Sequence, residues 1–171
     1  MTMRHNRAPP ANTKEPDQVR IFVFLHVAAM FTAVAFSLGP TFVLRRIGKS
    51  GDVPAIRRSF ALSAPIIKAI PIMFGIGALL GIVAIFANGF NPFQPFLLIA
   101  YGLFILASVV GAVVTTPWFM KVSKLAAESP DAAPSAELSA ALDDPRARFT
   151  DWFDPIIILA FLFDMIVKPF G

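Results

Sequence analysis

Four ionisable side chains lie inside or beside long apolar runs: His26, Lys68, Asp154 and Asp164. Charge is costly in hydrocarbon, so residues of this kind usually pair with one another or mark a functional site. A helix rise of about 1.5 Å per residue puts His26 level with Asp164 and Lys68 level with Asp154. We therefore expect two cross-helix pairs, His26 with Asp164 and Lys68 with Asp154. The alternative is separate satisfaction, in which Lys68 snorkels to the headgroups, Asp164 meets Lys168 one turn on, and His26 donates to a backbone carbonyl.

An imidazole in a membrane helix could also ligate haem iron, and His26 is the one histidine in an apolar run. Its second axial ligand would be a methionine such as Met30 or Met73, or none. The only other histidine is His5, and the chain has no cysteine. Thiolate nucleophiles, iron–sulfur clusters and histidine-rich metal sites are therefore excluded within one chain. We expect no catalytic residue, no metal site and no cofactor, with haem at His26 as the alternative.

Four long apolar segments must position these side chains. They cover residues 21–44, 60–87, 92–120 and 155–167. A bilayer core about 30 Å thick needs about 20 mostly apolar residues to be crossed by a helix. The chain is 56% hydrophobic and 15% charged, with a mean hydropathy of +0.69, whereas soluble domains carry about 25% charged residues. The predicted fold is an all-α integral membrane four-helix bundle, running up-down-up-down.

The predicted domain organisation is simple. Residues 1–19 form a polar tail rich in proline, and residues 20–171 form a single transmembrane domain. The expected helices lie near 20–46, 60–88, 92–120 and 150–168. A longer polar loop separates the third helix from the fourth, and within it Ser135–Leu142 favours a short helix available to dock onto a neighbouring protein or the membrane.

Small residues mark the expected helix contacts. Gly77 and Gly81 form a GxxxG pair, and Gly75 extends the same region. Ala107 and Gly111 supply small residues in the third segment. Small side chains let helix backbones approach closely in a membrane, so we expect helix packing at these five positions.

Basic residues flank the apolar segments unequally. With four crossings, one side holds both chain ends and five basic residues: Arg4, Arg7, Lys14, Arg20 and Lys168. The other side holds nine: Arg45, Arg46, Lys49, Arg57, Arg58, Lys121, Lys124, Arg146 and Arg148. The positive-inside rule therefore places loops 45–59 and 121–148 in the cytoplasm and both termini in the periplasm of a bacterial inner membrane. Because these charges flank membrane segments, the net charge of +4 does not indicate a nucleic-acid partner.

Several short motifs resemble a family of four-helix bacterial membrane proteins of unknown function. They are Phe24-Leu25-His26-Val27, Leu38-Gly39-Pro40, Leu44-Arg45-Arg46, the stretch 66–81 and Val167-Lys168-Pro169-Phe170. That family is similar to the copper-resistance D membrane domain and to the bacterial membrane protoporphyrinogen oxidase. The resemblance implies a haem or porphyrin role with His26 as ligand. The further polar residues of those relatives have no match between Pro92 and Met120, a stretch without charge, which weighs against an enzymatic activity.

The function that these patterns favour is a non-enzymatic accessory or structural subunit of a larger bacterial membrane complex. A respiratory or photosynthetic energy-transducing complex is the expected host, and the partners are the lipid bilayer and other membrane subunits. The alternative is a haem- or porphyrin-associated redox protein that uses His26. A small-molecule transporter is a weaker alternative, because the apolar segments supply few polar residues to line a mid-membrane cavity.

Overall fold

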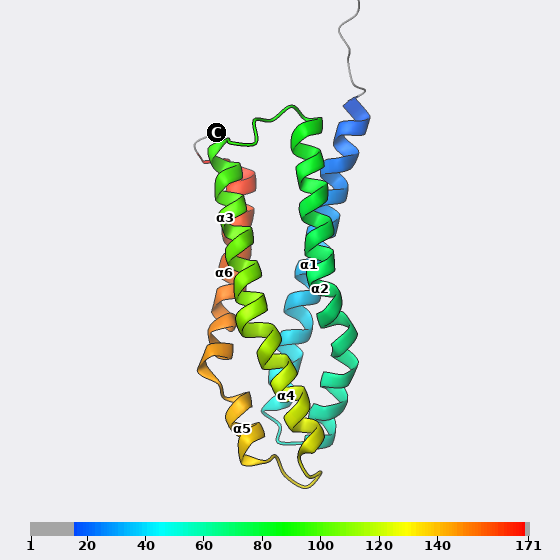
Figure 1. Ribbon diagram of the computed structural model, residues 1–171, viewed down its shortest axis with the longest axis vertical. Helices are drawn as coiled ribbons and strands as arrows, with labels where there is room; N and C mark the ends of the chain where they lie inside the picture. The colour runs from blue at the N-terminus through cyan, green and yellow to red at the C-terminus, as the bar shows by residue number, and fades with distance from the viewer. Residues whose placement is uncertain (1–15, 170–171) are drawn as a thin grey trace, which may run out of the picture.

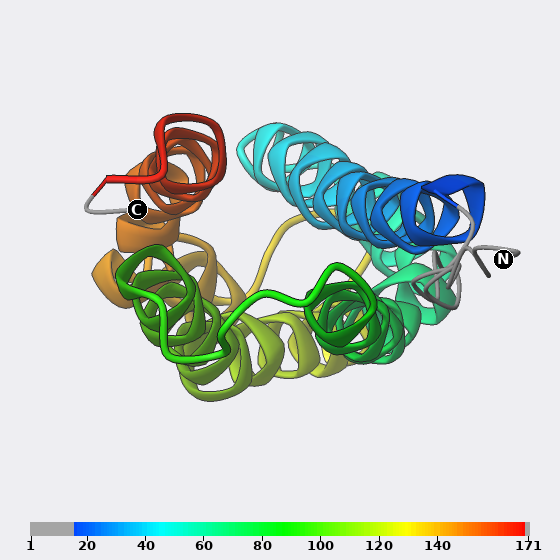
Figure 2. The same ribbon diagram turned by 90° about the horizontal axis from the view of Figure 1, so that it is seen from above.

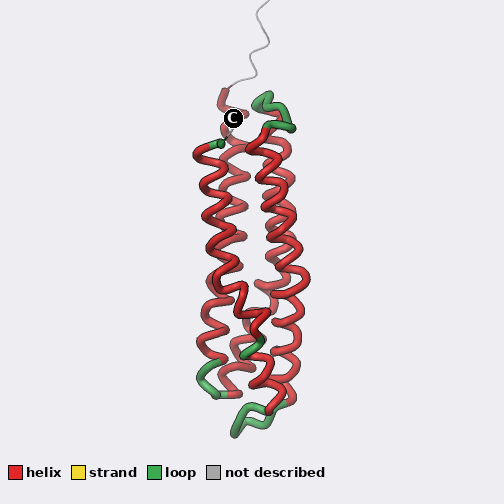
Figure 3. The backbone as a smooth tube through the Cα atoms, turned by 90° about the vertical axis from the view of Figure 1, so that its left-hand side faces the viewer, coloured by secondary structure: helices red, strands yellow, loops and turns green. Residues whose placement is uncertain are grey.

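The computed structural model describes residues 16–169, which are almost entirely helical and contain no strand (Figure 3). The predicted all-helical class is therefore confirmed for this range. Most of the predicted polar tail, residues 1–15, lies outside the described residues. The first helix begins at Pro16, a few residues before the predicted start at residue 20.

Four long helical stretches lie along the longest axis of the molecule (Figure 1). The elements in chain order are α1 (Pro16–Gly48), α2 (Val53–Ala87), α3 (Pro95–Val110), the π-helical turn η1 (Gly111–Thr115), α4 (Thr116–Glu128), α5 (Ala136–Leu142) and α6 (Pro145–Val167). Three stretches are long and apolar enough to cross a membrane: Arg20–Gly48, Val53–Ala87 and Pro95–Glu128. The fourth predicted span, in α6, falls short of that criterion because its first turns are polar.

The connection between α1 and α2 is much shorter than the predicted loop at 45–59. Asp52 caps α2, since its carboxylate accepts a hydrogen bond from the Ala55 N–H at 3.0 Å. Pro54 sits in the first turn of α2, where a missing N–H costs nothing. Of the basic residues in the expected loop, Arg45 and Arg46 therefore belong to α1 and Arg57 and Arg58 to α2, and only residues 49–52 form the turn.

The third apolar helix continues past Pro117 instead of ending there. Pro117 has no N–H for the Val113 carbonyl, and its ring would clash with that carbonyl in a regular α-helix. The chain widens into the π-turn η1, in which the Thr116 N–H bonds to the Gly111 carbonyl five residues back. The helix then resumes as α4 and leans towards α2 (Figure 1).

The long helices associate as two pairs. Seen from above, α1 lies beside α2, and α3 lies beside α6 (Figure 2). The α1–α2 pair is close because α2 presents glycines to α1. A Cβ atom added to Gly77 would lie 2.5 Å from the Met30 sulfur, and one added to Gly81 would lie 2.9 Å from the His26 ring.

The predicted packing role therefore applies to Gly77 and Gly81 but does not extend to every small residue that suggested it. Nothing lies within 4 Å of a Cβ added to Gly75 or to Gly111. Both glycines face open surroundings within the described residues, and Ala107 is half-buried. The close contact is thus a feature of α1 against α2 and is not shared by the start of η1.

The main core lies at the end of the molecule where α1 meets α2 and α4 meets α5. Its fully buried members include Leu44, Val53, Ile56, Phe60, Val122 and Leu138. Leu138 comes from α5, so the short helix predicted at Ser135–Leu142 docks on the chain's own core. The expectation that this segment is left for a neighbouring protein or the membrane surface is therefore wrong for its apolar face.

Candidate functional site

His26 is held by the backbone of α2. Its Nδ1 lies 2.7 Å from the carbonyl oxygen of Gly77, and its ring packs over Gly81. A carbonyl only accepts hydrogen bonds, so Nδ1 carries a proton, and in the neutral imidazole Nε2 is then the nitrogen with the free lone pair. This is the tautomer in which a histidine can ligate a metal through Nε2. The arrangement matches the expected alternative, in which His26 donates to a backbone carbonyl.

Asp164 is buried without a hydrogen-bond partner. Its side chain is 2% exposed, and neither carboxylate oxygen has a partner among the described residues. Lys168, one turn on, does not reach it through an ion pair. The Lys168 ammonium instead lies 5.3 Å from the centre of the Phe90 ring and 5.5 Å from that of Phe96. Within residues 16–169, the Asp164 carboxylate bonds neither to His26 nor to the Lys168 ammonium, and the only bond between Asp164 and Lys168 is the backbone one that ends α6, at 3.0 Å.

The second expected pair also stays apart. Lys68 is exposed on α2, and the described part of the chain contains no ion pair between it and Asp154. An exposed lysine on an apolar helix fits snorkelling towards the headgroups. Asp154 lies half-buried in α6, one turn beyond the residues that bind Arg45.

Arg45 makes three side-chain hydrogen bonds to the start of α6, as many as any other side chain in residues 16–169. Its guanidinium donates to the carbonyl of Ala147, to the hydroxyl of Thr150 at 2.9 Å, and to Asp151. The Nε atom lies 2.8 Å from a carboxylate oxygen of Asp151, and the guanidinium carbon lies 4.9 Å from the centre of the Trp118 ring. One side chain therefore ties the end of α1 to the start of α6 and to α4.

Two further polar contacts close this end of the molecule. The indole N–H of Trp118 donates to the Ala141 carbonyl at 2.9 Å, in a fully buried position. Arg57 donates to the carbonyls of Ala126 at 3.0 Å and Ser129 at 2.9 Å. Arg57 therefore satisfies carbonyls at the end of α4 that the helix leaves without partners.

The Arg45 contacts were not predicted from the sequence, because Arg45 and Arg46 counted there only as flanking charges of the loop at residues 45–59. A signal was nevertheless present. Ala147, Thr150 and Asp151 follow the i, i+3, i+4 spacing that places residues on one helix face. A hydroxyl and a carboxylate on that face form an acceptor set suited to a guanidinium.

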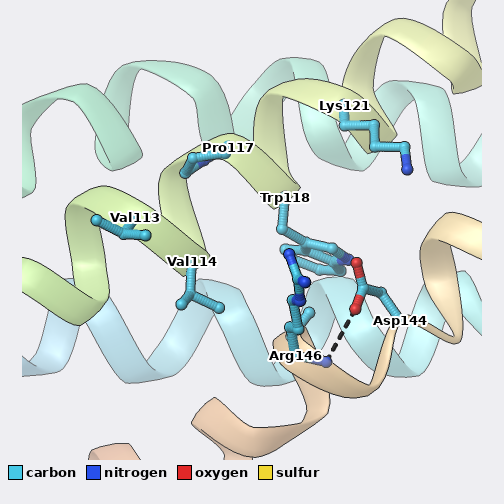
Figure 4. A pocket seen from close by; sticks show the side chains of 8 residues that line it. Val113, Val114, Pro117, Trp118, Lys121, Asp144 and Arg146 are labelled. Atoms are coloured by element: carbon cyan, nitrogen blue, oxygen red, sulfur yellow. Dashed lines mark hydrogen bonds between the residues drawn. The ribbon is translucent and has the colours of Figure 1, made fainter.

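A cavity of about 370 Å³ lies beside this cluster, between η1, α4 and the start of α6. Its wall comes from Val113, Val114, Pro117 and Trp118, and its charged lining from Lys121, Asp144 and Arg146 (Figure 4). The Asp144 carboxylate accepts a hydrogen bond from the Arg146 backbone N–H at 2.8 Å, so it caps α6. The cavity thus has an apolar part and a cationic part.

Comparison with known proteins gives no match to this chain among protein-family models, curated proteins or solved structures.

Proposed function

We propose that this chain is a multi-pass protein of a bacterial inner membrane and serves as a non-enzymatic accessory or structural subunit of a larger membrane complex. The observation that carries the proposal is the distribution of its apolar side chains. Large hydrophobic residues are exposed along all the long helices, among them Phe24, Phe31, Leu62, Leu79, Ile105 and Ile166. Such continuous apolar surface suits contact with lipid and with the helices of other subunits.

The polar interior supports a packing role at one end. The chain's own backbone and side chains accept the hydrogen bonds that Arg45, Trp118 and Arg57 donate. The two helix pairs meet mainly at that end, through α2 with α4 and α1 with α6. The opposite end, where α1 begins and α6 ends (Figure 1), therefore keeps helix surfaces available to partners. A respiratory or photosynthetic complex is the host class that we propose to test first.

Purification tests this role directly. The full chain carrying an affinity tag should be extracted from membranes only with detergent and should migrate in mild detergent as part of a larger assembly. Its partners can then be identified by mass spectrometry. A chain that purifies alone in every mild detergent, with no membrane complex altered by its deletion, contradicts the accessory role.

Cysteine labelling tests the proposed orientation. The chain has no cysteine, so each introduced thiol is the only one present. With both termini in the periplasm, Asn91→Cys in the loop between α2 and α3 should react with an impermeant maleimide in intact cells. Lys49→Cys, in the turn between α1 and α2, should react only after the cells are opened. The reverse pattern places the termini in the cytoplasm.

A haem- or porphyrin-binding role is the second candidate, and the hydrogen bond between His26 and Gly77 favours it. That bond leaves Nε2 of His26 as a possible axial ligand. Bound haem would supply electron-transfer chemistry, and His26 would hold and orient it. The purified protein should then show a Soret band that is lost in His26→Ala and kept in Met120→Ala, which replaces an exposed methionine. A colourless protein after expression with abundant haem contradicts this candidate.

A further inference from the structure

The cavity beside η1 combines two kinds of lining in one place. Val113 and Val114 from η1 and Pro117 from α4 form an apolar wall, and Val113 is 68% exposed. Lys121 follows Pro117 by one turn of α4, and Arg146 comes from the first turn of α6. Side chains from two helices therefore place two cations next to an apolar recess (Figure 4).

Both cations are available to a ligand. In residues 16–169, neither Lys121 nor Arg146 forms an ion pair, whereas Arg45 and Arg57 each have an acidic partner. The one carboxylate in the lining, Asp144, accepts a backbone hydrogen bond as the cap of α6. The side chains of Lys121 and Arg146 are both exposed.

The backbone explains why the recess forms here. Pro117 prevents a regular helix across residues 113–117, and the chain widens into the π-turn. Single π-turns of this kind occur frequently at functional sites. The recess also lies where the charge-free run 92–120 ends and Lys121 follows, which in the proposed membrane location is the level at which headgroups meet the hydrocarbon.

We propose that this cavity binds the headgroup of an anionic phospholipid, with Lys121 and Arg146 on the phosphate and the first part of an acyl chain along Val113, Val114 and Pro117. The apolar wall argues for a lipid over a free anion, because an inorganic phosphate would leave that wall in contact with water. The two unpaired cations argue for an anionic lipid over a zwitterionic one. This proposal rests on the membrane location given above.

Native mass spectrometry of the detergent-purified full chain tests the site. Dioleoylphosphatidylglycerol and dioleoylphosphatidylcholine are added at matched concentrations, and the lipid-bound fraction is measured for each. The double variant Lys121→Gln/Arg146→Gln should lose about 30-fold in phosphatidylglycerol affinity, because each cation near the surface contributes a factor of about 5. Its phosphatidylcholine binding should not change.

The matched control is Lys124→Gln/Arg148→Gln, which removes the same charge from the same two helices outside the cavity lining. It should keep the phosphatidylglycerol affinity of the unaltered chain. Equal losses in the two double variants would mean a general charge effect and would overturn the site. Thermal unfolding of both variants in detergent checks that each is folded, and Val113→Ser, which keeps both cations, should weaken lipid binding with less risk to folding.

Soluble competitors test whether the site recognises the whole lipid or only its phosphate headgroup. Glycerol phosphate and inorganic phosphate should displace phosphatidylglycerol only weakly, and effective displacement by either would overturn the role of the apolar wall. Fractionation of cells into membrane and soluble parts distinguishes a failure of the lipid site from a failure of the membrane assignment. A chain that stays in membranes but binds phosphatidylglycerol independently of Lys121 and Arg146 defeats the lipid site alone, whereas a chain soluble without detergent defeats both.

Discussion

Arg45 near the end of α1 forms an ion pair with Asp151 near the start of α6, with Nε 2.8 Å from Oδ1. The arginine side chain is 12% exposed and the aspartate side chain 44% exposed. Arg45 also donates to Ala147 and Thr150, so this contact is a network of hydrogen bonds around one charge. A network of this kind fixes the distance between the first and last long helices.

Replacing Arg45 by glutamine should lower the stability of the bundle. The change removes the guanidinium bonds to the Ala147 carbonyl and the Thr150 hydroxyl, which stay bonded to each other, and removes the partner of Asp151. The expected loss is about 2–4 kcal/mol in the free energy of unfolding. Thermal unfolding followed by circular dichroism in detergent measures it. The control is the adjacent exposed Arg46→Gln, which should stay within about 0.5 kcal/mol; equal losses would show that the network does not hold the helices together.

Replacing Trp118 by phenylalanine should also destabilise the protein. Trp118 is 6% exposed and gives its only donor to the Ala141 carbonyl. The variant keeps an aromatic ring but leaves that buried carbonyl unpaired, at a cost of roughly 1–3 kcal/mol. Trp152→Phe is the control, because Trp152 is 76% exposed. The same unfolding measurement should separate the two, and an unchanged midpoint for Trp118→Phe would contradict the contact.

Two glycines of α2 form a matched pair for testing the α1–α2 contact. Gly77→Val places new atoms against Met30, whereas Gly75→Val meets open space, and the helix propensity changes equally in both. We expect Gly77→Val to lose about 1–3 kcal/mol relative to Gly75→Val. Adding Met30→Ala to Gly77→Val should recover part of that loss, because the Met30 side chain is the nearest obstacle. The lack of any recovery would place the clash elsewhere.

Removing the carboxylate of Asp164 should stabilise the bundle. A buried charge without a partner is unfavourable, and leucine, although larger, has the same branching and number of side-chain heavy atoms and no polar atom. We expect Asp164→Leu to gain about 1 kcal/mol or more in detergent. A His26–Asp164 pair, as expected from helix depth, requires the opposite result. A double-mutant cycle with His26→Ala distinguishes the two, and a coupling clearly above zero would restore the pair.

The sequence predicts the long helices well because the length of an apolar run is enough to identify a helix that can cross a membrane. Uncharged runs such as 92–120 can hardly be anything else. Ser135 likewise signals the start of α5, and its hydroxyl does accept the Leu138 N–H at 3.1 Å. Boundaries were less accurate. Pro54 lies in the first turn of α2, where proline is tolerated, and Pro117 is accommodated by the π-turn η1, so the helix continues to Glu128.

The side-chain partners could not be predicted in the same way. Matching depths placed His26 with Asp164, but depth says nothing about the rotation of a helix around its axis. In the structure His26 faces the glycines of α2, and Asp164 is buried away from it without a partner. Gly77 and Gly81 predicted a helix contact better than depth did, because a helix surface without side chains lets a neighbouring backbone approach closely.

The contact between Arg45 and Asp151 also has a consequence for biosynthesis. During translation α1 is synthesised long before residue 151. Arg45 therefore has no Asp151 partner until the start of the last long helix has been made. A ribosome product that ends after Glu128 would contain the three stretches that are long and apolar enough to cross a membrane and yet lack the acceptors from Ala147 to Asp151. In such a fragment Arg45 would lack its partners in α6 and would be exposed to membrane quality-control proteases. The contact between Arg45 and Asp151 would therefore form only in chains that have been translated past residue 151.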